Sequence, residues 1–137
     1  MSQRLPLLFC AVVLTAVNAF GLDQDVDHVA QPVTNPGYTA EQAKAGKKVY
    51  KQHCLSCHPK GYFTQVFRAW QGEPLRDLFG VMRADMPQSN PGGLSPEVYT
   101  EILAYILAET DYPAGVTPLD PMSPGFRDIR IAPASMH

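Results

Sequence analysis

The sequence contains few cysteines, few charged residues of either sign and no long apolar run. The low charge and the short apolar run argue against two classes of protein: nucleic-acid-binding proteins and membrane-spanning proteins. Charged residues make up 18% of the 137 residues and the formal net charge is −2, which gives no reason to expect nucleic-acid binding. No basic stripe spaced with aromatic side chains occurs either. A mostly apolar run over residues 5–17 is shorter than the ~20 residues that a membrane span needs. We therefore expect a protein without nucleic-acid contacts and without stable membrane insertion.

The first twenty residues have the organisation of a secretory signal. Arg4 is the only early charge, the apolar run follows it, and residues 17–19 form an A-x-A-like end. We expect cleavage near Ala19, so that residues 1–19 are a removed signal peptide and the protein is exported to the periplasm. The alternative is an uncleaved N-terminal anchor.

Removal of that segment would take away Cys10 and leave Cys54 and Cys57. A lone cysteine pair in an exported protein favours a disulfide, but the next residue indicates other chemistry. Residues 54–58 read Cys-Leu-Ser-Cys-His, the C-x-x-C-H pattern of covalent haem attachment. Two cysteines three apart on a helical turn can reach both vinyl groups of one porphyrin edge. His58 then offers iron a neutral nitrogen donor.

Two other chemistries use similar cysteine spacing, and the chain lacks what each of them needs. A thiol oxidoreductase places its C-x-x-C beside a βαβ unit, and no such pattern occurs. A structural zinc site needs a second pair of ligands, which is also missing. The sequence therefore predicts one covalent haem c, held by Cys54 and Cys57 and ligated by His58.

Helical patterns surround this motif. Thr39 and Gln42 form a capping box that opens a helix over residues 40–52, and Gly46 and Tyr50 share one of its faces. Residues 59–73 are expected to be loop, with a helical turn at residues 66–70.

Two further helices follow. Pro74 begins a short amphipathic helix with apolar residues at 75, 78, 79 and 82, and that helix ends before Met86 because Pro87 follows. Ser95 and Pro96 begin a third helix that runs to about Glu109. No strands or internal repeats are expected, so the predicted fold is all-α with three main helices and long loops.

The same patterns divide the chain into four segments. After the signal peptide, residues 20–38 are expected to be an N-terminal arm and residues 39–110 the haem-binding domain. Residues 111–137 are rich in proline and are expected to be an extended tail that wraps around the domain or frays.

The second axial position of the iron needs another ligand. Met86 lies just past a helix and is fixed by Pro87, which leaves its soft thioether free to point inward. Met82 lies on the apolar stripe and is expected in the core, while Met122 and Met136 lie in the proline-rich tail, a poor place to hold a ligand rigidly. The histidines outside the motif are expected to be solvated: His28, His53 and His137. A His/Met pair would raise the reduction potential and keep the iron six-coordinate.

Gly46, Tyr50 and residues 54–58 resemble the N-terminal helix and haem site of class I cytochromes c, and residues 102–106 resemble their C-terminal helix. The resemblance implies a cytochrome c-like fold in which Gly46 and Tyr50 meet Ile102 and Tyr105. It also implies that Met86 is the axial sulfur.

Two parts of the chain follow the family less closely. Residues 59–85 are shorter than in mitochondrial members and do not map one by one. Trp70 has two interpretations: it bonds a haem propionate, as the family's tryptophan does, or it is a core or lid tryptophan.

Residues 86–107 are similar to small bacterial cytochromes and cytochrome domains that accept electrons from quinoprotein dehydrogenases. The resemblance covers about residues 39–115. It implies an electron carrier rather than an enzyme, with a quinoprotein dehydrogenase as donor and an oxidase or another cytochrome as acceptor. Four lysines of the first helix form either a surface that steers an acidic partner or an ordinary solvated face: Lys44, Lys47, Lys48 and Lys51. The alternatives are a dedicated dehydrogenase subunit and a haem protein whose open axial site binds a small ligand or peroxide.

Overall fold

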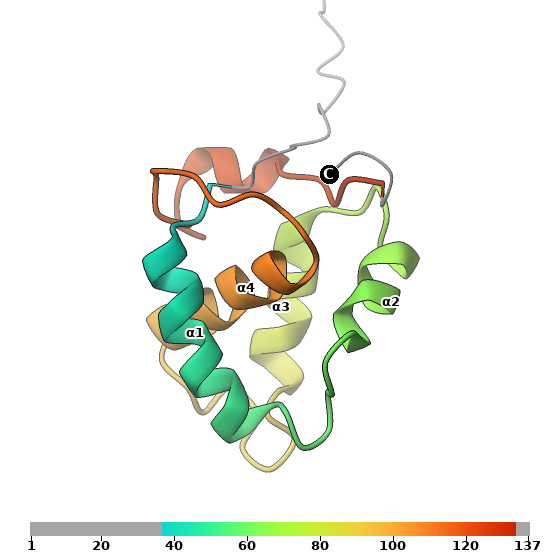
Figure 1. Ribbon diagram of the computed structural model, residues 1–137, viewed down its shortest axis with the longest axis vertical. Coiled ribbons are helices and arrows are strands. Elements are labelled where there is room, and N and C mark those ends of the chain that lie inside the picture. Colours follow the sequence, from blue (N-terminus) through green and yellow to red (C-terminus); the bar gives the residue numbers. More distant parts are fainter. Residues whose placement is uncertain (1–36, 134–137) are drawn as a thin grey trace, which may run out of the picture.

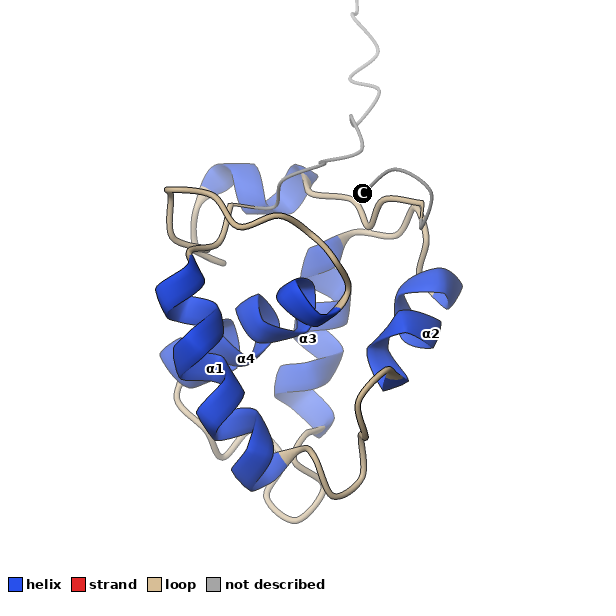
Figure 2. Ribbon diagram, viewed as in Figure 1, coloured by secondary structure: helices blue, strands red, loops and turns tan. Residues whose placement is uncertain are grey.

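The computed structural model describes residues 37–133, and this part of the chain is helical without any β-strand. Its elements are α1 (Ala40–His53), α2 (Tyr62–Ala69), α3 (Leu75–Asp85), α4 (Pro96–Glu109) and the 3-10 helix η1 (Pro124–Asp128) (Figure 1, Figure 2). The all-α prediction is confirmed. The expected signal peptide lies outside the described residues, as do His28, Met136, His137 and most of the expected N-terminal arm.

Helix α1 begins and ends where the local sequence predicts. The Thr39 side chain accepts a hydrogen bond from the Gln42 amide, and the Gln42 side chain accepts one from the Thr39 amide, so the capping box is complete. Gly46 and Tyr50 are the buried residues of this helix. The shared face predicted from their spacing is therefore the face that packs against the core.

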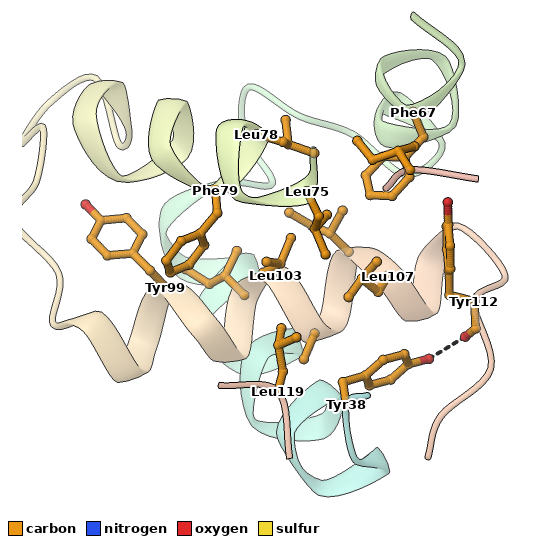
Figure 3. Packing of buried hydrophobic residues seen from close by; sticks show 14 of the residues in the cluster. Tyr38, Phe67, Leu75, Leu78, Phe79, Tyr99, Leu103, Leu107, Tyr112 and Leu119 are labelled. Atoms are coloured by element: carbon orange, nitrogen blue, oxygen red, sulfur yellow. Dashed lines mark hydrogen bonds between the residues drawn. The ribbon is translucent and has the colours of Figure 1, made fainter. Parts of the chain in front are cut away.

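Helix α4 is the centre of the molecule, because side chains cover it on more than one side. Its buried residues include Ile102, Leu103, Ala104, Ile106 and Leu107, which is more than the single stripe that an amphipathic surface helix presents. Side chains from α3 lie on one side of α4, and Tyr38 and Leu119 lie on the other (Figure 3).

Helices α1 and α4 approach each other closely at Gly46. A Cβ atom added to Gly46 would lie 1.8 Å from the Glu101 carbonyl oxygen, so only glycine fits where the two backbones meet. The rings of Tyr50 and Tyr105 lie 5.0 Å apart between their centroids one turn further along. The predicted meeting of Gly46 and Tyr50 with the 102–105 region is therefore present.

Helix α2 is longer than the helical turn expected at residues 66–70, and it adds a fourth helix to the three expected. It begins after Gly61, which has a positive φ of 84° and makes no side-chain cap. Glycine has no side chain that could cap the first turn, so no capping residue in the sequence marks the beginning of this helix. The spacing of Phe63, Val66, Phe67 and Trp70 is nevertheless the i, i+3, i+4, i+7 pattern of a helix, and all four contribute to the core or pack against it.

Residues 111–133 wrap around the helices instead of fraying. Leu119, Phe126, Ile131 and Ala132 are buried. The backbone pairs with the segment before α3: the Gly72 amide donates to the Ile131 carbonyl at 2.9 Å. Within the described range, no helix is both long and apolar enough to cross a membrane.

Candidate haem site

Helix α1 carries the C-x-x-C-H motif on a helical turn that continues from its last residue. The amides of Cys57 and His58 both donate to the Cys54 carbonyl, at 3.1 and 2.9 Å, and the Cys54 amide donates to the Tyr50 carbonyl at 2.8 Å. Cys54 is half-buried and Cys57 is exposed, and both are free thiols. The motif is therefore a helical turn whose two sulfur atoms form no disulfide, which is what attachment to one porphyrin edge needs.

The His58 imidazole is enclosed by aromatic rings and keeps an unsatisfied nitrogen. Its ring centroid lies 4.3 Å from that of Tyr62 and 5.7 Å from that of Phe63. Burial lowers the pKa of His58, which favours the neutral imidazole that binds metals. Its Nδ1 atom is buried without a hydrogen-bond partner. A buried polar atom of this kind calls for a partner. Two thiols beside a neutral imidazole are the groups that covalent haem attachment uses, so the residues present fit haem.

The backbone of His58 is tied to α1. The Tyr50 hydroxyl donates to the His58 carbonyl at 2.5 Å, and burial is the main cause that raises the pKa of Tyr50 to about 12. The phenol therefore stays protonated and able to donate across the physiological pH range.

Met86 caps the carboxyl end of α3. Its amide donates to the Met82 carbonyl at 3.1 Å, and its own carbonyl accepts a hydrogen bond from the Tyr99 hydroxyl at 2.6 Å. Helices α1 and α3 both run toward the same end of the molecule (Figure 1), so the motif and Met86 lie toward that end.

The other methionines of the described chain have different surroundings. Met82 packs against the hydrophobic core, as its place on the apolar stripe predicts, and Met122 is 87% exposed. Met86 is half-buried and is the methionine whose backbone is fixed by α3 on one side and by α4 on the other. It therefore remains the predicted axial sulfur.

The structure places Trp70 against the core and the α1 lysines at the surface. Trp70 follows α2 directly and packs partly buried against the core. Lys44, Lys48 and Lys51 are exposed, as is His53, and Lys47 places its ammonium 5.9 Å from the centre of the Tyr105 ring. The α1 lysines thus form an exposed basic face, which both interpretations of these residues require.

Sequence reasoning missed Tyr62 and Phe63, the two rings that contact His58. They lie four and five residues after it, at the start of α2. They were missed because residues 59–73 were expected to be mostly loop, and a loop gives no reason to place these rings beside His58. The helical spacing of Phe63 with Val66 and Phe67 was the signal that could have found them.

The comparisons with known proteins agree with the motif and the fold. Residues 41–106 match the family model described as cytochrome C oxidase, cbb3-type, subunit III. This segment runs from α1 into α4 and includes Cys54, Cys57, His58 and Met86. No curated protein and no solved structure matches the chain. Residues 41–106 are therefore a class I c-type cytochrome domain, the family predicted from the motif.

Proposed function

We propose that the protein is an exported single-haem cytochrome c that carries single electrons from a donor dehydrogenase to an acceptor such as an oxidase. A cytochrome c domain indicates a haem electron-transfer protein. The observation that carries the proposal is the C-x-x-C-H motif, fixed as a helical turn at the end of α1 within this domain.

The chain's own residues would hold the haem in the following way. Cys54 and Cys57 would bind it through thioethers, and His58 and Met86 would bind its iron. When bound, haem supplies reversible one-electron chemistry at iron. Tyr50 fixes the His58 backbone and Tyr99 fixes that of Met86. Tyr50 belongs to α1 and Tyr99 to α4, which pack against each other more extensively than any other pair of described helices. These hydrogen bonds would therefore limit movement of His58 and Met86 when the iron changes its oxidation state.

The donor and acceptor are proposed from sequence resemblance. Residues 86–107 resemble cytochromes that receive electrons from quinoprotein dehydrogenases, so a periplasmic dehydrogenase of that class is the proposed donor. An oxidase or another cytochrome is the proposed acceptor. Location in the periplasm follows from the signal-like residues 1–19. A dedicated subunit of one dehydrogenase is the second candidate, and co-purification at a fixed stoichiometric ratio would favour it.

The proposal also requires that His58 and Met86 would both bind the iron. A six-coordinate iron leaves no site for a substrate, whereas a peroxidatic haem needs an open position. The reduced protein should therefore bind carbon monoxide only slowly at neutral pH. Rapid binding to the unaltered protein would contradict the electron-carrier proposal.

A pair of variants tests the sulfur ligand. Met86→Ala should abolish the sulfur-to-iron charge-transfer band of the oxidised protein and speed carbon monoxide binding to the reduced one. Met82→Ala, in the neighbouring turn of α3, is the matched control and should keep the band. Survival of the band in Met86→Ala would show that another methionine binds the iron.

A further inference from the structure

A groove apart from the candidate haem site lies between α3, the start of α4 and the C-terminal segment. Its volume is about 510 Å³, within the range of pockets that bind ligands. None of the four proposed haem-binding residues lines it, and its lining includes Arg76, Arg83 and Arg127 but no acidic side chain. In a chain of net charge −2, this concentrates positive charge in one concave place.

The charge of these arginines is largely uncompensated. Arg76 lies 3.4 Å from Asp77, and both side chains are about half exposed, so this pair is weak. Within the described part of the chain, no carboxylate lies at ion-pair distance from Arg83 or Arg127. The nearby Asp120 carboxylate accepts a hydrogen bond from the Met122 amide instead. Guanidinium groups without ion-pair partners favour carboxylates, which they can bind through two parallel hydrogen bonds.

The groove also has apolar surfaces. The rings of Phe79 and Phe126 meet edge to face at 5.8 Å, and the Arg83 guanidinium lies 5.7 Å from the centre of the Phe79 ring. Met122 contributes to the lining with a side chain that is 87% exposed. A flexible thioether beside aromatic rings is typical of surfaces that adapt to an apolar side chain of a partner.

We infer that this groove is a docking site for an acidic segment of a partner protein. Carboxylates of that segment would pair with Arg83 and Arg127, and one apolar side chain would lie against Phe126 and Met122. The combination of unpaired guanidinium groups with an apolar lining favours such a segment over a lipid headgroup or a free anion, which would use the charges alone. Docking does not depend on the proposed electron-transfer function.

The groove is adjacent to the segment that carries Met86. Tyr99 contributes to its lining, and the hydroxyl of Tyr99 bonds to the Met86 carbonyl. A protein docked here would therefore lie against the proposed axial-ligand segment, while the exposed Cys57 is outside the groove lining.

Three synthetic peptides test the inference on the ¹⁵N-labelled, haem-loaded protein in its reduced state at low ionic strength. The probe is acetyl-Glu-Asp-Phe-Glu-Asp-Leu-amide. One matched peptide has lysine for each acid, and the other has serine for phenylalanine and leucine. We expect the acidic peptide to shift the amide signals of Gly80, Gly92 and Met122. The lysine peptide should leave them unmoved, and the serine peptide should bind roughly fivefold more weakly.

Charge-reversal variants locate the site. Arg83→Glu combined with Arg127→Glu should weaken binding of the acidic peptide roughly tenfold or more. Arg68→Glu, on the exposed surface of α2 and outside the groove lining, should change it less than about twofold. The inference is overturned by no shift at the groove, or by equal weakening in Arg68→Glu. It is also overturned if inorganic phosphate or phosphatidylglycerol vesicles alone reproduce the shifts, because the groove would then be a general anion or lipid site.

Discussion

Two contacts of the core are built in opposite ways. Where α1 crosses α4, the backbones approach so closely that an added Cβ at Gly46 would overlap the Glu101 carbonyl. Where residues 111–133 complete the core, large side chains such as Leu119, Phe126 and Ile131 are buried. The first contact depends on the absence of a side chain, and the second depends on the presence of several.

This difference matters for the site. The close contact ties together the helix that carries the haem-attachment motif and the helix whose Tyr99 anchors Met86. The C-terminal segment instead covers the amino end of α3, through the hydrogen bond from the Leu75 amide to the Ile129 carbonyl at 2.9 Å. We therefore expect changes at the first contact to disturb the site and changes at the second to reduce stability.

The largest expected effect comes from adding one methyl group at the first contact. Gly46→Ala should lower the free energy of unfolding by more than about 4 kcal/mol, because the Glu101 backbone has to move. Gly80→Ala in α3 is the matched control: an added Cβ there meets nothing within 4 Å. That variant should be neutral or more stable by about 0.5–1 kcal/mol. Guanidinium unfolding of both variants measures the difference, and equal stabilities would refute the close contact.

Removing a side chain should break the second contact. Phe126→Ala should cost about 3 kcal/mol of unfolding free energy, because it opens a cavity beside Phe79. Met122→Ala, at an exposed position four residues earlier, should change stability by less than about 0.5 kcal/mol. If Phe126→Ala proves as mild as its control in denaturant unfolding, the C-terminal segment is not part of the core.

The Tyr38 side chain makes one of several hydrogen bonds between the start of the described chain and the segment after α4. The Tyr38 hydroxyl donates to the Tyr112 carbonyl at 2.5 Å (Figure 3). Tyr38→Phe keeps the ring but leaves that carbonyl without this donor, so unfolding should become easier by about 1 kcal/mol. Tyr62→Phe, at a 40% exposed position, is the control and should stay within about 0.5 kcal/mol. Urea unfolding of the two variants compares them, and indistinguishable values would contradict the role of the bond.

The smallest expected effect is a loss of unfolding free energy at alkaline pH, where Tyr38 and Tyr112 of the same junction become ionised. Burial raises the pKa of Tyr38 and of Tyr112 above the usual 10. Their contribution to stability is then complete below pH 10 and is lost as the pH rises through the folded-state pKa values. Unfolding measured between pH 9 and 12 should show this decline, and Tyr38→Phe should reduce it. An identical decline in the variant would exclude Tyr38 as a cause.

The parts of the fold that could be predicted are those with local signals. The capping box of α1, the Ser95-Pro96 start of α4 and the residue before Pro87 each fix a helix boundary within a few neighbouring residues. The motif itself is local too, since Cys54, Cys57 and His58 share one helical turn.

The parts that could not be predicted depend on distant contacts. Helix α2 begins at a glycine without a side-chain cap, and its rings reach His58 only once the helix forms. The path of residues 111–133 is set by backbone pairing across more than fifty positions, as between Glu73 and Ile131. No periodic pattern in the tail encodes such a contact, because its prolines interrupt regular structure.

The most direct test of the central claim is the intact mass of the protein made with a working haem-ligation system and denatured in acid and organic solvent. The account predicts the polypeptide plus one haem, and loss of that added mass when Cys54 and Cys57 are both replaced by serine. A colourless protein with the mass of the bare polypeptide would contradict it.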